Sequence, residues 1–104
     1  MNDANFVITE EKTPEGIALT IKGMVNSMNA DKLLDRLKEA MKDKQKNIIL
    51  NMFWVEFLSS AGIRVILKTY QDANDLGGSL GIKMPSENVR NVLGMTALDE
   101  MLIK

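Results

Sequence analysis

The feature that most limits the possible folds is the regular alternation of short apolar segments with longer amphipathic ones. Short apolar runs typical of β-strands occupy residues 6–11, 17–23, 47–51 and 79–84. Longer segments with apolar residues at helical spacing occupy residues 29–43, 61–75 and 86–94. Strands that are joined through helices favour a parallel arrangement, so this order of segments predicts an α/β fold.

The first two strands are the exception, because only a short turn separates them. The sequence "TPEG" at residues 13–16 contains Pro14 and Gly16, which are typical turn residues. This connection predicts an antiparallel hairpin. A final apolar run, "MLIK" at residues 101–104, is a candidate fifth strand. We therefore predict a mixed, mostly parallel sheet of four or five strands with three helices, in one domain that spans residues 1–104.

Helix signals and apolar spacing refine this prediction. Ser27 or Asn29 is placed to cap the start of the first helix, and Gly77-Gly78 is placed to end the second. The spacing also predicts one buried face on each helix and a buried centre in the third strand. The residues that we expect to be buried on this basis are Leu37, Ile49, Ile63, Leu67 and Leu93.

The composition removes several classes of function. The chain has no His and no Cys, so it lacks the usual general base, the thiolate nucleophile and the commonest ligands of transition metals. The net charge is -1, which gives no field of one sign to attract nucleic acid or an acidic membrane. No apolar run approaches the ~20 residues of a membrane-spanning helix, and the N-terminus lacks the pattern of a signal peptide. We therefore expect a cytoplasmic protein with no catalytic residue, no metal and no cofactor.

An adjacent pair of serines, Ser59 and Ser60, stands where the third strand passes into the second helix, within "VEFLSSAGIRVIL". Either hydroxyl can cap the helix, which contributes about 1 kcal/mol, while Ala61 and Gly62 permit close backbone packing. A catalytic serine would need a base and a G-x-S-x-G turn, and the sequence offers neither pattern. Phosphorylation is the third interpretation, because a helix N-terminus tolerates a phosphate that a partner surface would not.

The segment "FLSSAGIRVIL" resembles the signature of STAS domains, and particularly that of bacterial anti-sigma factor antagonists. The resemblance extends over nearly the whole chain, through "LTIKGMVNSMNADKLLDRLKEAM", "NIILNM" and "VLGMTALDEMLI". Members of this family have a β-sheet with helices packed against it, and their usual role is to bind other proteins without catalysis. The resemblance therefore implies a regulatory binding module.

In antagonists of this family, the unphosphorylated form binds an anti-sigma factor that is also a serine kinase, and this frees the sigma factor for RNA polymerase. The kinase phosphorylates the antagonist, and a serine phosphatase reverses the reaction. By its position in the motif, Ser60 corresponds to the phosphorylated hydroxyl. The same resemblance implies partner contacts at Asn26, Ser59, Ser60 and Gly62. ATP would belong to the kinase, since this chain has no Gly-rich phosphate loop.

Three positions depart from the family pattern, because they are neutral where many members carry an acid. They are Asn26 in a Gly-x-x-Asp-like turn, Asn51 at the expected end of the third strand, and Ser59. If acids there help a kinase to recognise its substrate, phosphorylation of Ser60 would be slow or absent. Two alternatives therefore stay open: a STAS subunit of a transporter or ATPase that is never phosphorylated, and a small-ligand sensor with a pocket beside the serine loop.

The aromatic pair Phe53-Trp54 lies in an unusually apolar segment, "MFWVE", which we expect to be a loop. We interpret the pair as an anchor in the core or the loop. Since Trp is enriched at hot spots of protein interfaces, Trp54 is also a candidate for partner binding. The methionines are interpreted mainly as core residues, although Met24, Met28 and Met52 could line an adaptable binding surface. A second copy of the chain is a further candidate partner, since it could cover part of the sheet.

Overall fold

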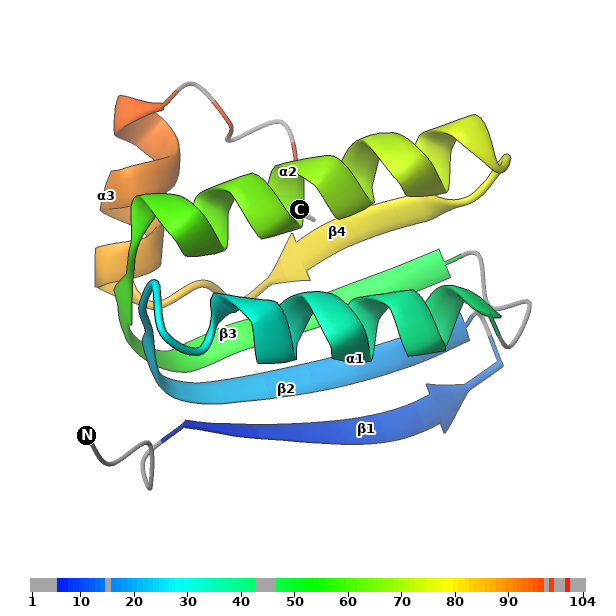
Figure 1. Cartoon of the computed structure of the whole chain (residues 1–104), viewed down its shortest axis with the longest axis horizontal. Helices are drawn as coiled ribbons and strands as arrows, with labels where there is room; N and C mark the ends of the chain where they lie inside the picture. The colour runs from blue at the N-terminus through cyan, green and yellow to red at the C-terminus, as the bar shows by residue number, and fades with distance from the viewer. Residues whose placement is uncertain (1–5, 15, 43–46, 97, 99–100, 102–104) are drawn as a thin grey trace.

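The computed structural model describes residues 6–14, 16–42, 47–96, 98 and 101. Figure 1 shows the strands and helices in the order that the sequence predicts. Their bounds are β1 (Val7–Thr13), β2 (Gly16–Val25), α1 (Ala30–Lys42), β3 (Asn47–Leu58), α2 (Ser60–Asp75), β4 (Ser79–Lys83) and α3 (Glu87–Met95). The largest difference from the prediction is in β3, which continues through the expected loop as far as Leu58.

The strands form a four-stranded sheet in the order β1-β2-β3-β4. β1 pairs with β2 in antiparallel orientation, whereas β2, β3 and β4 are parallel. The predicted α/β fold, with a mixed and mostly parallel sheet and three helices, is therefore confirmed. Of the candidate fifth strand, Met101 lies in a short 3-10 turn and residues 102–104 lie outside the described residues.

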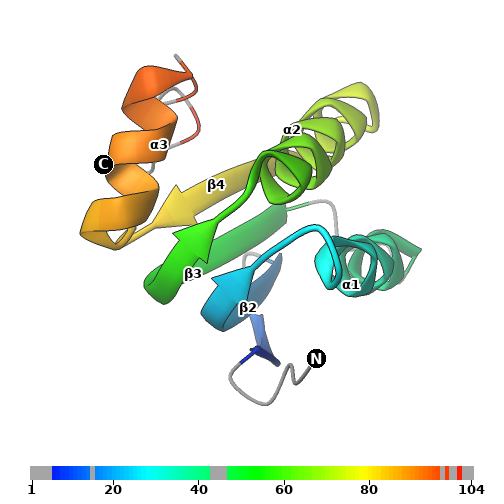
Figure 2. The same ribbon diagram turned by 60° about the vertical axis from the view of Figure 1, so that its left-hand side comes forward.

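The helices are distributed over two sides of this sheet. Figure 2 shows α1 and α2 together on one face, with α3 apart from them near β3 and β4. Two hydrogen bonds tie the start of α3 to β3: the backbone N–H of Ser86 donates to the carbonyl of Met52 at 3.1 Å, and the Asn88 amide donates to the carbonyl of Glu56 at 2.6 Å. α3 therefore lies along the part of β3 that extends beyond β4.

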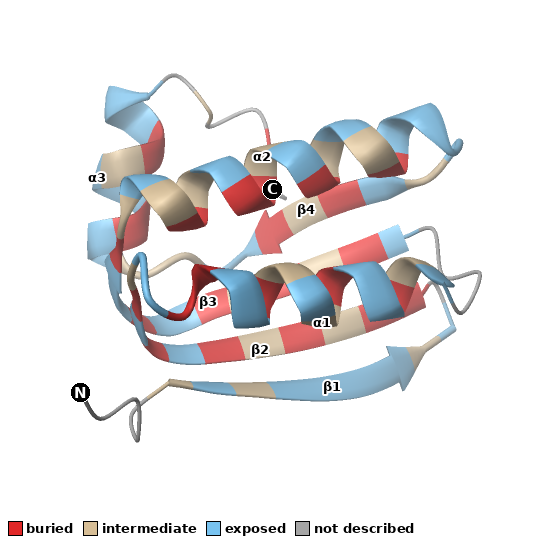
Figure 3. Cartoon of the chain, viewed as in Figure 1, coloured by how far each residue is buried: buried red, intermediate tan, exposed pale blue. Residues whose placement is uncertain are grey.

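The core lies between the sheet and the helices α1 and α2. Along β2 and the first half of β3, buried and less buried residues alternate, as expected for strands with one face on a core (Figure 3). The predicted burial of Leu37 on α1 and Leu93 on α3 is confirmed. Burial of apolar side chains is the main stabilising contribution to such a domain.

The predicted burial of Ile49, Ile63 and Leu67 is wrong, since each of them is only half-buried. Ile49 stands between two strand residues that face the core, so its side chain lies on the opposite face of the sheet. On α2, Ile63 and Leu67 each come directly after a buried residue, Gly62 and Ile66, so they lie about 100° around the helix from it. The residues that α2 does bury are Gly62, Val65, Ile66, Thr69 and Ala73.

The end of α2 agrees with the prediction from Gly77-Gly78. The backbone N–H of Gly78 donates to the carbonyl of Ala73 at 2.8 Å, and that of Gly77 donates to the carbonyl of Asn74 at 3.1 Å. Gly77 has a φ of 82°, a left-handed conformation that glycine adopts without strain. Together these contacts form a Schellman motif, which satisfies the last carbonyls of the helix.

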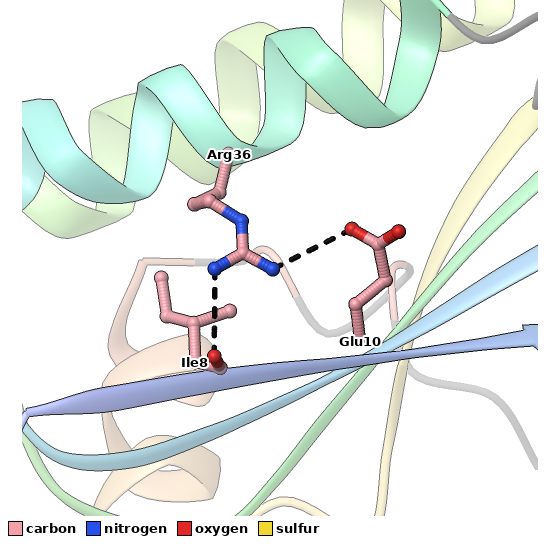
Figure 4. A network of polar contacts seen from close by, with 3 residues as sticks. All are labelled: Ile8, Glu10 and Arg36. Carbon is pink, nitrogen blue, oxygen red and sulfur yellow. Dashed lines mark hydrogen bonds and ion pairs between the residues drawn. The ribbon is translucent and has the colours of Figure 1, made fainter.

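A polar contact joins α1 to the edge strand β1. Figure 4 shows the guanidinium of Arg36 donating to the carbonyl of Ile8 and facing the carboxylate of Glu10, each at 3.5 Å. Both charged side chains are about one-third exposed, so their ion pair contributes at most about 1 kcal/mol. The attachment of β1 also includes its antiparallel pairing with β2 from Val7 to Thr13 and the packing of Ile8 against the core.

Candidate functional site

The connection between β3 and α2 holds the serine pair, and Ser59 is its structural member. The Ser59 Oγ accepts a hydrogen bond from the backbone N–H of Gly62 at 3.2 Å. Its carbonyl accepts from Ile63 at 2.9 Å, and its own N–H donates to the carbonyl of Val25 at 2.8 Å. Ser59 is therefore the N-cap of α2, and three hydrogen bonds fix it between that helix and β2.

Ser60, by contrast, is exposed and is the first residue of α2. Within the described part of the chain, no hydrogen bond engages its hydroxyl. The first turn of α2 contains no acidic residue, so the free N–H groups and the helix dipole have no negative side chain beside them. Ser60 thus combines an accessible hydroxyl with surroundings that favour an anion.

Gly62 lies beneath the serine loop and not on its surface. It is buried, and a Cβ at this position would stand 2.7 Å from Cγ1 of Val25 and 2.8 Å from Cδ1 of Leu58. Such distances are too short for ordinary contacts, so only glycine lets the helix approach the ends of β2 and β3 so closely. The sequence predicts partner contact at Gly62, but the structure places this residue inside the fold, where it fixes the position of the loop.

The connection between β2 and α1 lies beside the serine loop (Figures 1 and 2), and Asn26 organises it. The Asn26 Oδ1 accepts from the N–H groups of Met28 at 2.9 Å and Asn29 at 3.0 Å. In return, the Asn29 Oδ1 accepts from the N–H of Asn26 at 2.9 Å, and its amide donates to the carbonyl of Met24 at 2.8 Å. These reciprocal hydrogen bonds resemble those of a capping box and close the turn that leads into α1. Asn29, one of the two predicted caps, stands directly before α1, and its carbonyl accepts from the N–H of Leu33 at 3.2 Å. At Asn26 an amide serves as the acceptor that an acid would otherwise provide, without its charge.

The neutral residue Asn51 lies elsewhere. β3 continues past it to Leu58, so the expectation that Asn51 ends the strand near the serine loop is wrong. Its Oδ1 accepts from the N–H of Phe53 at 3.2 Å, beside an irregularity in the pairing of β3 with β2. Of the three neutral positions, only Asn26 and Ser59 are therefore close to Ser60.

The second half of β3 presents aromatic side chains to solvent. The pairing of β2 with β3 shifts register twice, between Thr20 and Lys22 and again between Gly23 and Met24. Trp54 lies opposite Lys22 between the two shifts, and Phe57 lies opposite Met24 after the second. Trp54 is 57% exposed, so the interpretation of the aromatic pair as a core anchor is wrong.

The exposed aromatic rings contact one another and a cation. The rings of Phe53 and Trp54 form an edge-to-face pair with centroids 4.9 Å apart, and the Lys22 ammonium lies 6.0 Å from the centre of the Trp54 ring. Large apolar side chains that remain exposed together are typical of protein-binding surfaces. The sequence analysis named Trp54 as a candidate for partner binding but did not predict that Phe53, Trp54 and Phe57 are exposed together. The register shifts interrupt the alternation by which strand faces are recognised.

The two connections that lie side by side carry Ser60, the half-buried Asn26 and the exposed Met28. We call the residues Asn26, Met28 and Ser60 the serine surface. Met24 and Phe57 precede the buried residues Val25 and Leu58 that face Gly62, so their side chains lie on the face of the sheet that points away from α2. Met24, Met28 and Phe57 are exposed, whereas Met52, also considered for such a surface, is buried in the core. The serine surface therefore combines one exposed apolar side chain, that of Met28, with one accessible hydroxyl, that of Ser60.

The described residues contain no group of three or more His, Cys, Asp or Glu side chains arranged to hold a metal ion. No helix in the described ranges is both long and apolar enough to span a membrane. A hollow of about 370 Å³ lies between β1 and α1, away from the serine loop, and its lining residues are Phe6, Ile8, Lys32, Asp35 and Arg36.

Comparison with known sequences identifies the family and curated relatives, of which BtrV is an example. The sequence profile of the STAS domain matches residues 8–104. BtrV of Bordetella bronchiseptica, which carries the name of a candidate anti-sigma factor antagonist, is 27% identical over 85 residues. The aligned region is 82% of this chain and 73% of BtrV.

Comparison with solved structures gives the same fold. An anti-sigma factor antagonist from Mycobacterium paratuberculosis has a TM-score of 0.85 at 18% identity, covering 97% of this chain and 86% of that one. Unphosphorylated SpoIIAA has a TM-score of 0.82 at 17% identity, covering 93% and 86%. The phosphorylated form of SpoIIAA from Bacillus has a TM-score of 0.76 at 18% identity, covering 93% and 89%. All three share the sheet and the helix arrangement described above.

Proposed function

The chain belongs to the STAS domain family, and from this premise we propose that it is an anti-sigma factor antagonist controlled by phosphorylation of Ser60. In this function the unphosphorylated chain binds an anti-sigma factor that is a serine kinase, and a serine phosphatase restores the binding form. The relatives named as antagonists support the general role. The chain itself acts as a binding module in the cytoplasm, where sigma factors act, and not as an enzyme.

The main support for this proposal is that the two serines have different structural roles. Ser59 is held as the cap of α2, whereas Ser60 is exposed with a hydroxyl that the described fold does not use. A phosphate on Ser60 would add about -1.5 to -2 charges at pH 7. The helix N-terminus favours that charge, so phosphorylation would leave the fold intact.

The serine surface explains how the same phosphate would affect a partner. Met28, in the connection beside the serine loop, is an exposed apolar side chain and suits a partner that covers it with apolar groups. A phosphate at Ser60 would then be removed from water without a matching cation. This burial of an unpaired charge is strongly unfavourable. The phosphorylated form would therefore bind the partner more weakly than the unphosphorylated form.

The neutral residues near Ser60 favour a second candidate function. Asn26 supplies the hydrogen bonds of its turn without charge, and Ser59 is likewise neutral. A kinase that reads acidic side chains at these positions would find none. The alternative is therefore a STAS subunit of a transporter or ATPase that uses the same surface without phosphorylation.

The test begins with capture of the partner by the wild-type chain from its native cells and its identification as an anti-sigma factor or a transporter. Calorimetric titration of the purified partner then compares wild type, Ser60→Ala and Ser60→Asp. We expect Ser60→Ala to bind within about 3-fold of wild type and Ser60→Asp to bind at least about 100-fold more weakly. Gln71→Glu is the matched control, since it adds one charge to an exposed position on α2 about 16 Å from Ser60.

Incubation of the captured anti-sigma factor with ATP and the wild-type chain tests whether the anti-sigma factor phosphorylates Ser60. We expect phosphate on Ser60 by mass spectrometry, and none on the Ser60→Ala variant. Equal affinities for wild type, Ser60→Ala and Ser60→Asp would mean that the serine pair only caps the helix. That result, together with a transporter as the captured partner, would establish the alternative function.

A further inference from the structure

The face of the sheet that points away from α1 and α2 carries a group of neighbouring exposed side chains. Along β2, Lys22 and Met24 lie between residues that are buried against the core, so both side chains point to this opposite face. The strand pairing places Trp54 opposite Lys22 and Phe57 opposite Met24. The ring of Phe53 packs edge-to-face against that of Trp54. We call Lys22, Met24, Phe53, Trp54 and Phe57 the sheet patch.

Both exposure and strand direction mark the sheet patch as a binding surface. Its four apolar side chains, Met24, Phe53, Trp54 and Phe57, are all exposed, whereas folded monomers usually expose such residues singly. β2, β3 and β4 are parallel, and parallel sheets are ordinarily covered on both faces. Among the described helices, α1 and α2 cover one face, and none lies over β2 on the other (Figure 2). The sheet therefore offers a partner an uncovered apolar surface at this patch.

The cation at the centre of the patch indicates the charge of that partner. The Lys22 ammonium lies 6.0 Å from the centre of the Trp54 ring. In the described part of the chain it has no carboxylate within ion-pair distance, and Glu56, the only acid of β3, forms no ion pair with it. A second cation, Lys83, lies at the end of β4. A partner carboxylate would therefore meet an unpaired cation among apolar side chains.

The same cation makes a second copy of this chain a poor occupant of the patch. A two-fold dimer brings the same surface of both copies together. With patch against patch, the two Lys22 ammonium groups would approach each other while their surroundings lose water. Like charges placed together in this way weaken a contact strongly. The occupant must instead carry acidic groups where this chain carries a base.

The spacing of the patch fits an α-helix. One row holds Lys22 and Trp54, and the next row holds Met24 and Phe57. The rows are two residues of β2 apart, which is about 7 Å. Four residues of a helix rise about 6 Å, so apolar side chains at positions i and i+4 reach both rows. A helix laid along the strands would cover this face as α1 and α2 cover the other.

We propose that the sheet patch is a docking site for an amphipathic helix of a second protein. In this complex the apolar residues of the helix contact Trp54 and Phe57, and a carboxylate beside them pairs with Lys22. The proposal goes beyond the proposed function, because the patch lies on the face of the sheet opposite α2, the helix that begins with Ser60. A charge at Ser60 should therefore leave this binding unchanged.

The first experiment uses a synthetic helix as the probe. The peptide has about 18 residues, long enough to be helical in water, with leucine at positions i, i+4 and i+7 and glutamate beside them. Its control peptide has lysine in place of each glutamate. Trp54 is the only tryptophan of the chain, so its fluorescence reports directly on the patch.

We expect the acidic peptide to shift the Trp54 emission to shorter wavelength and to bind with a Kd below about 1 mM. The lysine peptide should bind at least about 10-fold more weakly. Absence of binding by the acidic peptide at about 1 mM, or equal affinities of the two peptides, would overturn the proposal.

Three variants, measured by calorimetry, locate the site. Trp54→Ala should weaken binding of the acidic peptide by at least about 10-fold. Lys22→Glu should reverse the preference, so that the lysine peptide binds more tightly than the acidic one. Met95→Ala, the matched control, removes an exposed apolar side chain of α3 outside the patch and should bind as wild type does. Binding that survives Trp54→Ala would contradict the proposed location.

Two further measurements test the occupant and the independence of the site. Analytical ultracentrifugation of the chain alone should show a monomer, and a dimer that Trp54→Ala dissociates would mean that a second copy covers the patch. Ser60→Asp should bind the acidic peptide as wild type does, and a loss of affinity would show that the two sites are not separate. None of these measurements uses an anti-sigma factor, so the proposed function is tested separately.

Discussion

Two helices of this chain, α2 and α3, begin with a serine cap of the same geometry, yet their first turns differ. The Ser59 Oγ accepts from the N–H of Gly62 at 3.2 Å, and the Ser86 Oγ accepts from the N–H of Val89 at 3.2 Å. After the cap, α3 continues with an acid, Glu87, whereas α2 continues with Ser60. In both helices the serine cap already satisfies an N–H group of the first turn. The residue after the cap, Ser60 in α2 and Glu87 in α3, is therefore not needed as a cap.

The difference shows what a second serine adds at the start of α2. In α3, Glu87 places a permanent negative charge on the positive end of the helix, which is its favourable position. In α2 the same position is neutral and exposed. Phosphorylation of Ser60 would give α2 the charge arrangement that α3 already has. The proposed switch thus adds a charge where helices ordinarily accept one.

The third residue after each cap shows how the two helices attach to the sheet. Val89 of α3 is a fully buried side chain, so this helix docks by inserting side chains. Gly62 of α2 has no side chain, so the helix backbone itself approaches Val25 and Leu58. Because that approach leaves no room, the serine loop is held rigidly at the ends of β2 and β3.

The largest effect that we expect from these two regions is at Gly62. Gly62→Ala should lower the free energy of unfolding by about 1–3 kcal/mol, the usual range for overpacking a core. The new methyl group would meet Val25, whose branched side chain cannot move aside easily, as well as Leu58. Urea unfolding, monitored by circular dichroism, measures the loss.

The matched control is Gly94→Ala in α3, where a Cβ would meet nothing within 4 Å. There the same substitution should raise the stability by about 0.5–1 kcal/mol, because alanine favours a helix over glycine. If both variants change stability in the same direction, the close approach of α2 to the sheet is not what distinguishes the two helices.

The second effect, about equal in the two helices, concerns the caps. Ser59→Ala and Ser86→Ala should each lower the free energy of unfolding by about 1 kcal/mol, because each leaves one N–H of the first turn without its acceptor. Ser60→Ala should stay within about 0.5 kcal/mol of wild type, as expected for an exposed side chain outside the core. A loss at Ser60→Ala as large as that at Ser59→Ala would mean that the roles of the two serines are wrongly assigned.

The caps also show how far the sequence could predict this molecule. A serine pair between a buried strand and an amphipathic helix indicates a cap, and both the fold class and the approximate bounds of the elements follow from such patterns. The buried face of α2 followed only in part, since Ile63 and Leu67 were expected to be buried and are half-buried. That helix has apolar residues on several sides. The close approach of Gly62 to Val25 and Leu58 contributes to its orientation, and the spacing of apolar residues in the sequence does not show this contact.

The exposure of the aromatic side chains of β3 was equally difficult to predict from the sequence pattern. Strand residues alternate between faces only while the pairing is regular, and β3 pairs with two register shifts. Trp54 and Phe57 therefore remain exposed in a segment whose continuous apolar sequence indicates burial. Register shifts depend on pairing with a distant strand, so a local pattern cannot show them.

The smallest effect is the charge at the first helical position, and it tests the comparison most directly. Ser60→Asp gives α2 the acid that α3 has, so it should fold normally and gain about 0.3–1 kcal/mol at low salt. Glu87→Gln removes that acid from α3 and should lose a similar amount. Both changes should shrink as sodium chloride is raised to about 1 M, where the Debye length falls to about 3 Å. Urea unfolding of each variant and of wild type, at low and at high salt, measures these changes in the free energy of unfolding. A destabilised Ser60→Asp at low salt would show that the start of α2 does not accept negative charge, and the physical basis of a harmless phosphate at Ser60 would be lost.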